Sequence, residues 1–165
     1  MQKIIVSKNT LFYDDFKFKC SVGKNGFSLN KKEGDNKTPK GTFFLGPLYY
    51  RKDRVSKLIT DIKKIKIESS MGWCDDSSNK NYNKLIRVNK DTKTRHEKLF
   101  LKQNSYDLVV PVLYNTKKII KKRGSAIFLH LTVNYKKTAG CIALNKKDML
   151  ILLKLINKKT KIKIA

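Results

Sequence analysis

Two residues toward the C-terminal end of the chain, Cys141 and His130, carry side chains suited to nucleophilic catalysis. A thiol with an ordinary pKa of about 8.5 is mostly protonated at neutral pH, and a neighbouring histidine can take its proton to leave a reactive thiolate. The other cysteines, Cys20 and Cys74, form no CxxC pair, and the only other histidine is His96. The pattern favours a cysteine–histidine acyl-transfer site and predicts no metal and no cofactor.

Two apolar segments of strand length must position this pair, Ser125–Leu131 and Gly140–Leu144. If they pair antiparallel through the loop at 133–137, His130 lies opposite Cys141, with the two Cβ atoms about 4.5–5.5 Å apart. Gly140 allows close backbone approach, so the N–H groups of Gly140 and Cys141 are candidates for an oxyanion hole. The structural alternative is a cysteine packed as a small hydrophobe beside a histidine at a strand end.

Several motifs together resemble the L,D-transpeptidase catalytic domain (YkuD family), in particular a compact bacterial branch of it. The similar segments run from Gly34 to Leu144 in the family's order. They are Glu33–Phe43 (EGDNKTPKGTF), Met71–Asp76 (MGWCDD) with Tyr82–Asn83, Tyr106–Val110, Gly124–His130 (GSAIFLH) and Thr138–Cys141. The resemblance implies a single catalytic domain over residues 1–165.

By this resemblance, the reaction is acyl transfer on peptidoglycan stem peptides. Cys141 attacks the L-centre of the diamino acid at stem position three and releases D-alanine, and an amine from a second stem resolves the thioester. His130 acts as base and then as acid, and Thr138 orients the site. The family also implies the cell envelope as the compartment. Trp73 and Tyr82 are expected as walls of the substrate groove, although edge-of-core aromatics fit the pattern equally well.

Two departures from the family pattern concern the substrate. Ala139 stands where the family usually has histidine, and Ala143 stands where an arginine often follows. Arg123 is our candidate for binding the stem-peptide carboxylate instead. Water as acceptor would make the same residues an L,D-carboxypeptidase or endopeptidase, and a catalytically retired domain that still binds glycan is a third interpretation.

The charge balance is strongly basic, with 38 Lys and Arg against 13 Asp and Glu and a formal net charge of +25. The lysines are spread along the chain and no aromatic–arginine platform accompanies them, so no specific nucleic-acid partner is predicted. A binding module for polyanions remains the competing functional class. The densest basic segment, Lys117–Arg123, is either a solvated face or a docking surface for an anionic envelope polymer.

The length and patterning indicate one mainly β domain, a β-sandwich or barrel of mixed sheets with one main C-terminal helix. We expect a helix over Met149–Ile156 with Asn145 as its N-cap, and a last strand over Lys161–Ile164. Gly72–Asn83 reads as a long loop and Arg95–Leu101 as a short helical turn. Met1–Ser7 resembles a first strand rather than a signal peptide, and no segment reaches transmembrane length. We expect a monomer.

Overall fold

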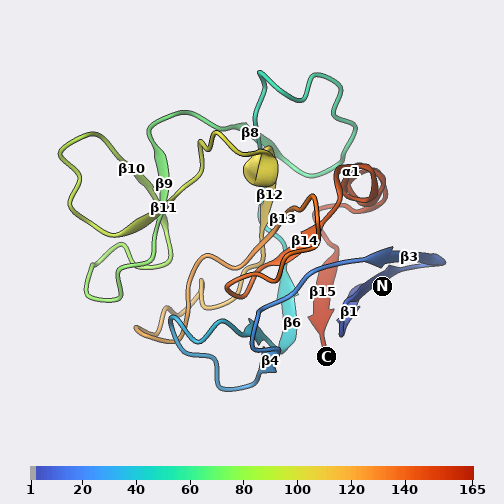
Figure 1. The fold of residues 1–165 in the computed structure, drawn as a ribbon, viewed down its shortest axis with the longest axis horizontal. Helices are drawn as coiled ribbons and strands as arrows, with labels where there is room; N and C mark the ends of the chain where they lie inside the picture. The colour runs from blue at the N-terminus through green and yellow to red at the C-terminus, as the bar shows by residue number, and fades with distance from the viewer. Residues whose placement is uncertain (1–2) are drawn as a thin grey trace.

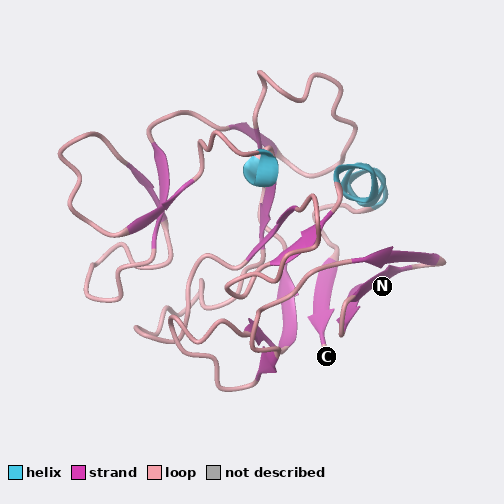
Figure 2. Cartoon of the chain, in the orientation of Figure 1, coloured by secondary structure: helices cyan, strands magenta, loops and turns pink. Residues whose placement is uncertain are grey.

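The computed structural model describes residues 3–165 and contains four sheets, one α-helix and one short 3-10 helix (Figures 1 and 2). Their bounds are β1 (Lys3–Ser7), β2 (Thr10–Tyr13), β3 (Phe16–Lys19), β4 (Phe27–Ser28), β5 (Thr38–Pro39), β6 (Gly41–Phe44), β7 (Leu48–Tyr50), β8 (Lys64–Lys66), β9 (Met71–Cys74), β10 (Leu85–Arg87), β11 (His96–Lys98), η1 (Asn104–Tyr106), β12 (Leu108–Pro111), β13 (Phe128–Leu131), β14 (Ile142–Leu144), α1 (Lys146–Leu155) and β15 (Lys161–Ile164). The expected mainly β architecture of mixed sheets with one C-terminal helix is confirmed.

The first five-stranded sheet, in the order β3-β2-β1-β15-β6, joins the two ends of the described chain. In β1, Ile4 and Val6 are buried while Lys3 and Ile5 face outward, the alternation of a sheet with one covered face. The expected terminal strand, β15, pairs parallel with β1 and antiparallel with β6. The part of the Met1–Ser7 prediction that concerns residues 1 and 2 lies outside the described residues.

The second five-stranded sheet, in the order β14-β13-β12-β7-β8, contains the two segments singled out above. All residues of β12 and β14 are buried, as their continuous apolar sequence predicts. However, β13 and β14 pair parallel, with His130 opposite Ala143, so the antiparallel pairing expected from the sequence is wrong. The loop between them runs back along the sheet, so that β14 starts at the same end of the sheet as β13, as parallel pairing requires.

A small three-stranded sheet, β10-β9-β11, projects from the rest of the fold at the left of Figure 1. It corrects two predictions: the segment expected to be a long loop opens with β9, and the expected helical turn at Arg95–Leu101 contains β11. All four residues of β9 are buried, and Met71 and Trp73 pack in one apolar cluster with residues of the second sheet, so tertiary packing holds this short strand.

Helix α1 begins where the capping residues predict. Asn145 has extended backbone angles, and its side-chain oxygen accepts a 2.8 Å hydrogen bond from the Asp148 amide. Met149, Leu152 and Leu153 pack into the main core between the large sheets. No helix in the described residues is long and apolar enough to cross a membrane.

A second, smaller core cluster links the small sheet to β13. It contains Trp73, Tyr106, Phe128 and Cys141, with the Trp73 and Phe128 rings edge to face at 5.3 Å. The predicted nucleophile therefore lies at the margin of a packed aromatic cluster, where its position is fixed by its neighbours.

Candidate active site

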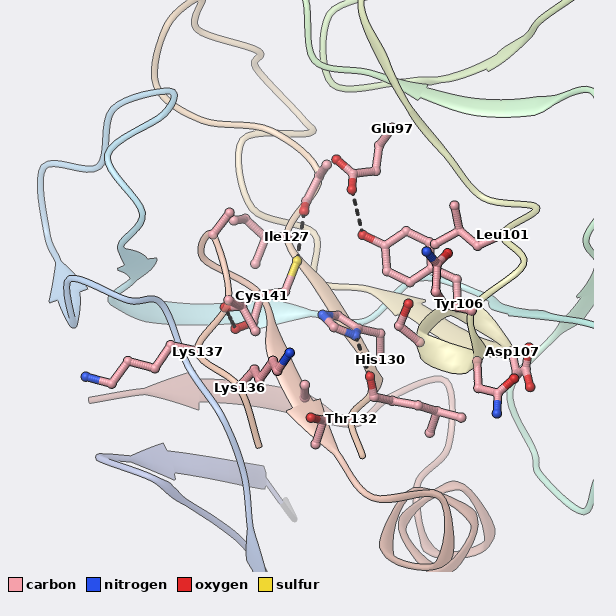
Figure 3. A pocket seen from close by; sticks show the side chains of 18 of the residues that line it. Glu97, Leu101, Tyr106, Asp107, Ile127, His130, Thr132, Lys136, Lys137 and Cys141 are labelled. Carbon is pink, nitrogen blue, oxygen red and sulfur yellow. Dashed lines mark hydrogen bonds between the residues drawn. The ribbon is translucent and has the colours of Figure 1, made fainter. Parts of the chain in front are cut away.

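A cleft of about 670 Å³ opens between the second sheet, η1 and the loop that leads into β14 (Figure 3). Cys141 and His130 both line it, together with Tyr106, Thr138 and Ala143. One wall carries the carboxylates of Glu33, Asp75 and Glu97, and the loop at 132–137 contributes Lys136 and Lys137. Sequence segments from four separate parts of the chain thus meet around one thiol.

The parallel register places His130 and Cys141 as diagonal neighbours. His130 lies opposite Ala143, and Cys141 precedes Ala143 by two residues, on the same face. The Phe128 amide, two residues before His130, lies 3.3 Å from the Cys141 sulfur. Both residues therefore line the same cleft, although the strand pairing from which the sequence placed them together was wrong.

The orientation of the His130 ring is set by its own strand. Nδ1 lies 2.9 Å from the Leu131 carbonyl oxygen, so in the neutral ring Nδ1 carries the proton and Nε2 has a free lone pair. Figure 3 shows this second nitrogen on the side of the ring that faces the Cys141 sulfur. The Tyr106 ring packs edge to face against the imidazole at 5.2 Å. Burial lowers the pKa of His130, and hydrogen bonding to the backbone of Leu131 and Ser105 opposes that shift.

The Cys141 thiol is only 9% exposed and is hydrogen-bonded on both sides. It donates to the Ala126 carbonyl oxygen at 3.2 Å and accepts from the Phe128 amide at 3.3 Å. Burial raises the pKa of this thiol to about 12. The resting pair is therefore a neutral thiol beside a neutral imidazole, and a thiolate forms only if the proton moves to His130.

The turn before the nucleophile is locked by Thr138 and Gly140. The Thr138 hydroxyl donates to the Cys141 carbonyl oxygen at 2.6 Å and accepts from the Gly140 amide at 3.1 Å. Gly140 has a φ of 142°, and a Cβ there would lie 2.8 Å from the Lys37 carbonyl oxygen. Only glycine fits this position, and its N–H, expected in an oxyanion hole, is bonded to Thr138 in this structure.

Residues 2–164 match the model of the YkuD family, the L,D-transpeptidase catalytic domain. The chain belongs to this family. Among solved structures, it is similar to Mycobacterium tuberculosis L,D-transpeptidase 1, with a TM-score of 0.48 and 10% identity over 99% of this chain. The aligned region spans 58% of that protein. No curated protein sequence matches the chain.

In this member of the L,D-transpeptidase family, Trp73 lies outside the cleft in which it was expected from the sequence. Trp73 is 8% exposed and does not line the cleft, but its Nε1 donates to Asn83, whose side-chain oxygen also accepts from the Ala126 amide. Ala126 has a left-handed φ of 52°, and its carbonyl is the acceptor for the Cys141 thiol. Trp73 is thus linked to the Cys141 sulfur through three successive hydrogen bonds, by way of Asn83 and Ala126.

Tyr82 and Arg123 also lie outside the cleft lining. The Tyr82 hydroxyl is buried, donates to Glu33 and accepts from the Gly124 amide at 3.0 Å. Arg123 is exposed, and its carbonyl oxygen accepts from the Tyr114 hydroxyl. Their expected substrate contacts remain predictions. The exposed basic residues that line the cleft are Lys136, Lys137 and Lys146.

Sequence reasoning missed three residues of the cleft. Tyr106 shields His130, Glu97 accepts a 2.9 Å hydrogen bond from the Tyr106 hydroxyl, and Lys31 lines the wall beside Gly140. Tyr106 is the first residue of a segment that resembles the family, so the sequence offered a signal for it. Glu97 and Lys31 lie in charged segments whose sequence does not indicate a role in the site. In residues 3–165, no three His, Cys, Asp or Glu side chains gather as metal ligands.

Proposed function

We propose that this protein is a cysteine-dependent acyltransferase of peptidoglycan stem peptides, with Cys141 as nucleophile and His130 as general base and acid. The observation that carries the proposal is the Nδ1 contact to Leu131, which leaves Nε2 of His130 free on the side that faces the Cys141 sulfur. A base with a fixed tautomer beside a thiol is the arrangement that nucleophilic catalysis needs.

The first step transfers the thiol proton to Nε2 of His130 while sulfur attacks the peptide carbonyl carbon. Collapse of the tetrahedral intermediate breaks the C–N bond, and the imidazolium returns the proton to the D-alanine amine that leaves. The product is a thioester on Cys141. An amine of a second stem peptide then attacks the thioester carbonyl and restores the thiol, which closes the cycle.

The charges around the cleft suit a stem peptide, which carries both carboxylates and amines. Figure 3 shows Lys136 extending toward His130 and Lys137 extending away from the site. We assign Lys136 to a substrate carboxylate, in the role predicted for Arg123, and the wall with Glu33 and Glu97 to an amine. The buried Tyr82 and Ser125 hydroxyls, both bonded to Glu33, hold that carboxylate in place.

The test is intact-mass spectrometry after incubation with a disaccharide-tetrapeptide. Wild type should gain the mass of the substrate minus D-alanine, because a thioester replaces the broken peptide bond. Cys141→Ala should gain none, and His130→Ala should accumulate it at least a hundredfold more slowly. Cys74→Ala and His96→Ala are the matched controls, since both residues lie on the small sheet, and should react like wild type. Released products distinguish cross-linking from hydrolysis, and a wild type without adduct or turnover refutes the proposal.

A further inference from the structure

Lys31 is a buried cation next to the nucleophile, and nothing in the mechanism above uses it. Its residue is 3% exposed, although lysine is rarely buried without a partner. The part of it that remains accessible lines the same cleft as Cys141. A charge in such a place costs free energy of desolvation, so its neighbours must favour it strongly.

The surrounding backbone is shaped around this side chain. Gly124 has a φ of 103°, and a Cβ there would lie 2.8 Å from Cε of Lys31. A Cβ on Gly140 would lie 3.5 Å from the Lys31 Nζ. The two glycines therefore make room for the aliphatic stem and for the ammonium, and the ammonium sits against the residue that precedes Cys141.

The counter-ion of Lys31 lies behind it. Nζ donates to Asp35 at 2.7 Å and to the Lys32 carbonyl at 3.3 Å, and Asp35 itself accepts from the backbone amides of Lys32 and Lys37. Burial alone would raise the pKa of Asp35, but these hydrogen bonds lower it overall. Asp35 does not line the cleft and Lys31 does, so the positive end of the pair faces the site.

We propose that Lys31 is the buried positive charge that stabilises the Cys141 thiolate, and the oxyanion that follows from it, during acyl transfer. The proposal rests on the assigned role of Cys141 as nucleophile. A thiol enclosed by apolar groups needs such a charge, because a low-dielectric site disfavours separation of thiolate and imidazolium. Burial is the largest influence on the pKa of Cys141 and raises it; the hydrogen bond from the Phe128 amide lowers it, the Glu97 carboxylate raises it, and the Lys31 charge lowers it. Tyr106 and His130 complete the groups that face the sulfur.

The experiment measures alkylation of Cys141 in the full chain with two reagents of similar size, neutral iodoacetamide and anionic iodoacetate, followed by peptide mass spectrometry. It is done in 1 M NaCl, where the Debye length of about 3 Å screens surface lysines. The variants are Lys31→Met/Asp35→Asn, which removes both charges and leaves neither unpaired, and Lys31→Arg, which keeps the charge.

We expect the double variant to react about tenfold more slowly with iodoacetamide across pH 7–10, the effect of a pKa raised by about one unit. Its iodoacetate-to-iodoacetamide rate ratio should also fall, a charge effect that altered access alone would not produce. Lys31→Arg should keep both values near wild type. A folded double variant with wild-type rates and ratio would overturn the proposal and leave Lys31–Asp35 as a structural ion pair.

If the double variant does not fold, the iodoacetate-to-iodoacetamide rate ratio of wild type tests the proposal. A ratio above that of glutathione under the same conditions supports a cation at the sulfur, and an equal or lower ratio refutes it. None of these measurements needs a stem peptide. A protein that shows no acyl transfer but retains the Lys31 effect on alkylation would therefore lose the proposed function and keep the assignment of Lys31.

Discussion

At the scale of single residues, the side chains of Cys141 and His130 are both uncharged in the resting site. Burial disfavours both ions of the catalytic pair, because it lowers the pKa of His130 and raises that of Cys141 to about 12. A preformed thiolate–imidazolium pair is therefore not the resting state. In the proposed mechanism, the proton transfer is coupled to substrate binding, when the leaving amine and the developing oxyanion share the charge.

This neutral pair predicts the acid limb of the pH–rate profile. His130 must be neutral to accept the thiol proton, and its lowered pKa keeps it neutral to pH values below 6.5, the ordinary pKa of histidine. We expect kcat/KM for the tetrapeptide to stay on its plateau at pH 6.5 and to fall tenfold per pH unit only below the His130 pKa. His96→Ala should show the same limb. An inflection at or above 6.5 would contradict the neutral resting pair.

At the scale of elements, the parallel pairing of β13 with β14 brings Cys141 beside the strand that carries His130, and the turn before β14 fixes the backbone position of Cys141. Thr138 and Gly140 hold that turn through hydrogen bonds and close packing against the Lys37 carbonyl. The loop that contains Lys31 and Lys37 therefore shapes both the backbone below Cys141 and the charge beside it. Segments distant in sequence depend on each other here for their conformation.

Replacement of Gly140 by alanine tests this packing. A Cβ would both strain a φ of 142° and clash with the Lys37 carbonyl oxygen at 2.8 Å, so we expect a loss of about 3 kcal/mol in the free energy of unfolding. Gly26→Ala is the matched control, because Gly26 has a φ of 79° and open space around it, and should lose about 1 kcal/mol. Urea unfolding measures both. Equal losses in the two variants would show that the contact with Lys37 is unimportant.

A comparison of predicted and observed elements shows which parts of the fold the sequence alone could predict. Local signals predicted α1 with its Asn145 cap and the strands β1, β13, β14 and β15, because capping and apolar runs act over a few residues. The parallel pairing of β13 with β14 was missed, since register depends on the path of the connecting loop. The strand β9 was missed because its four residues lead directly into a polar loop, and β11 was missed because pairing with β9 overrides its polar composition. Cys141 and His130 could be proposed from their residue types and motifs, whereas the positions of Lys31 and Glu97 in the cleft could be recognised only from the folded structure.

At the scale of the whole molecule, the net charge of +25 is a cost to folding as well as a means of attracting anions. Five ion pairs join side chains in the described residues, and several of their members are exposed and contribute little. With 38 basic side chains against 13 acidic ones, at most about a third of the basic side chains can each pair with a carboxylate of their own. Compaction therefore brings like charges together, and the two apolar cores must outweigh that repulsion.

Salt should consequently stabilise this protein. Between 10 mM and 1 M NaCl the Debye length falls from about 30 Å to about 3 Å, which screens repulsion among surface lysines but not the buried Lys31–Asp35 pair. We expect Tm, followed by circular dichroism, to rise by about 3 °C, equivalent to roughly 1 kcal/mol for a domain of this size. A variant with the exposed Lys57, Lys90 and Lys158 changed to Glu, which lowers the net charge by six, should start from a higher Tm and gain less. A Tm that falls with salt, or an equal gain in the variant, would mean that the basic surface is already neutralised by local pairing and that repulsion does not limit the fold.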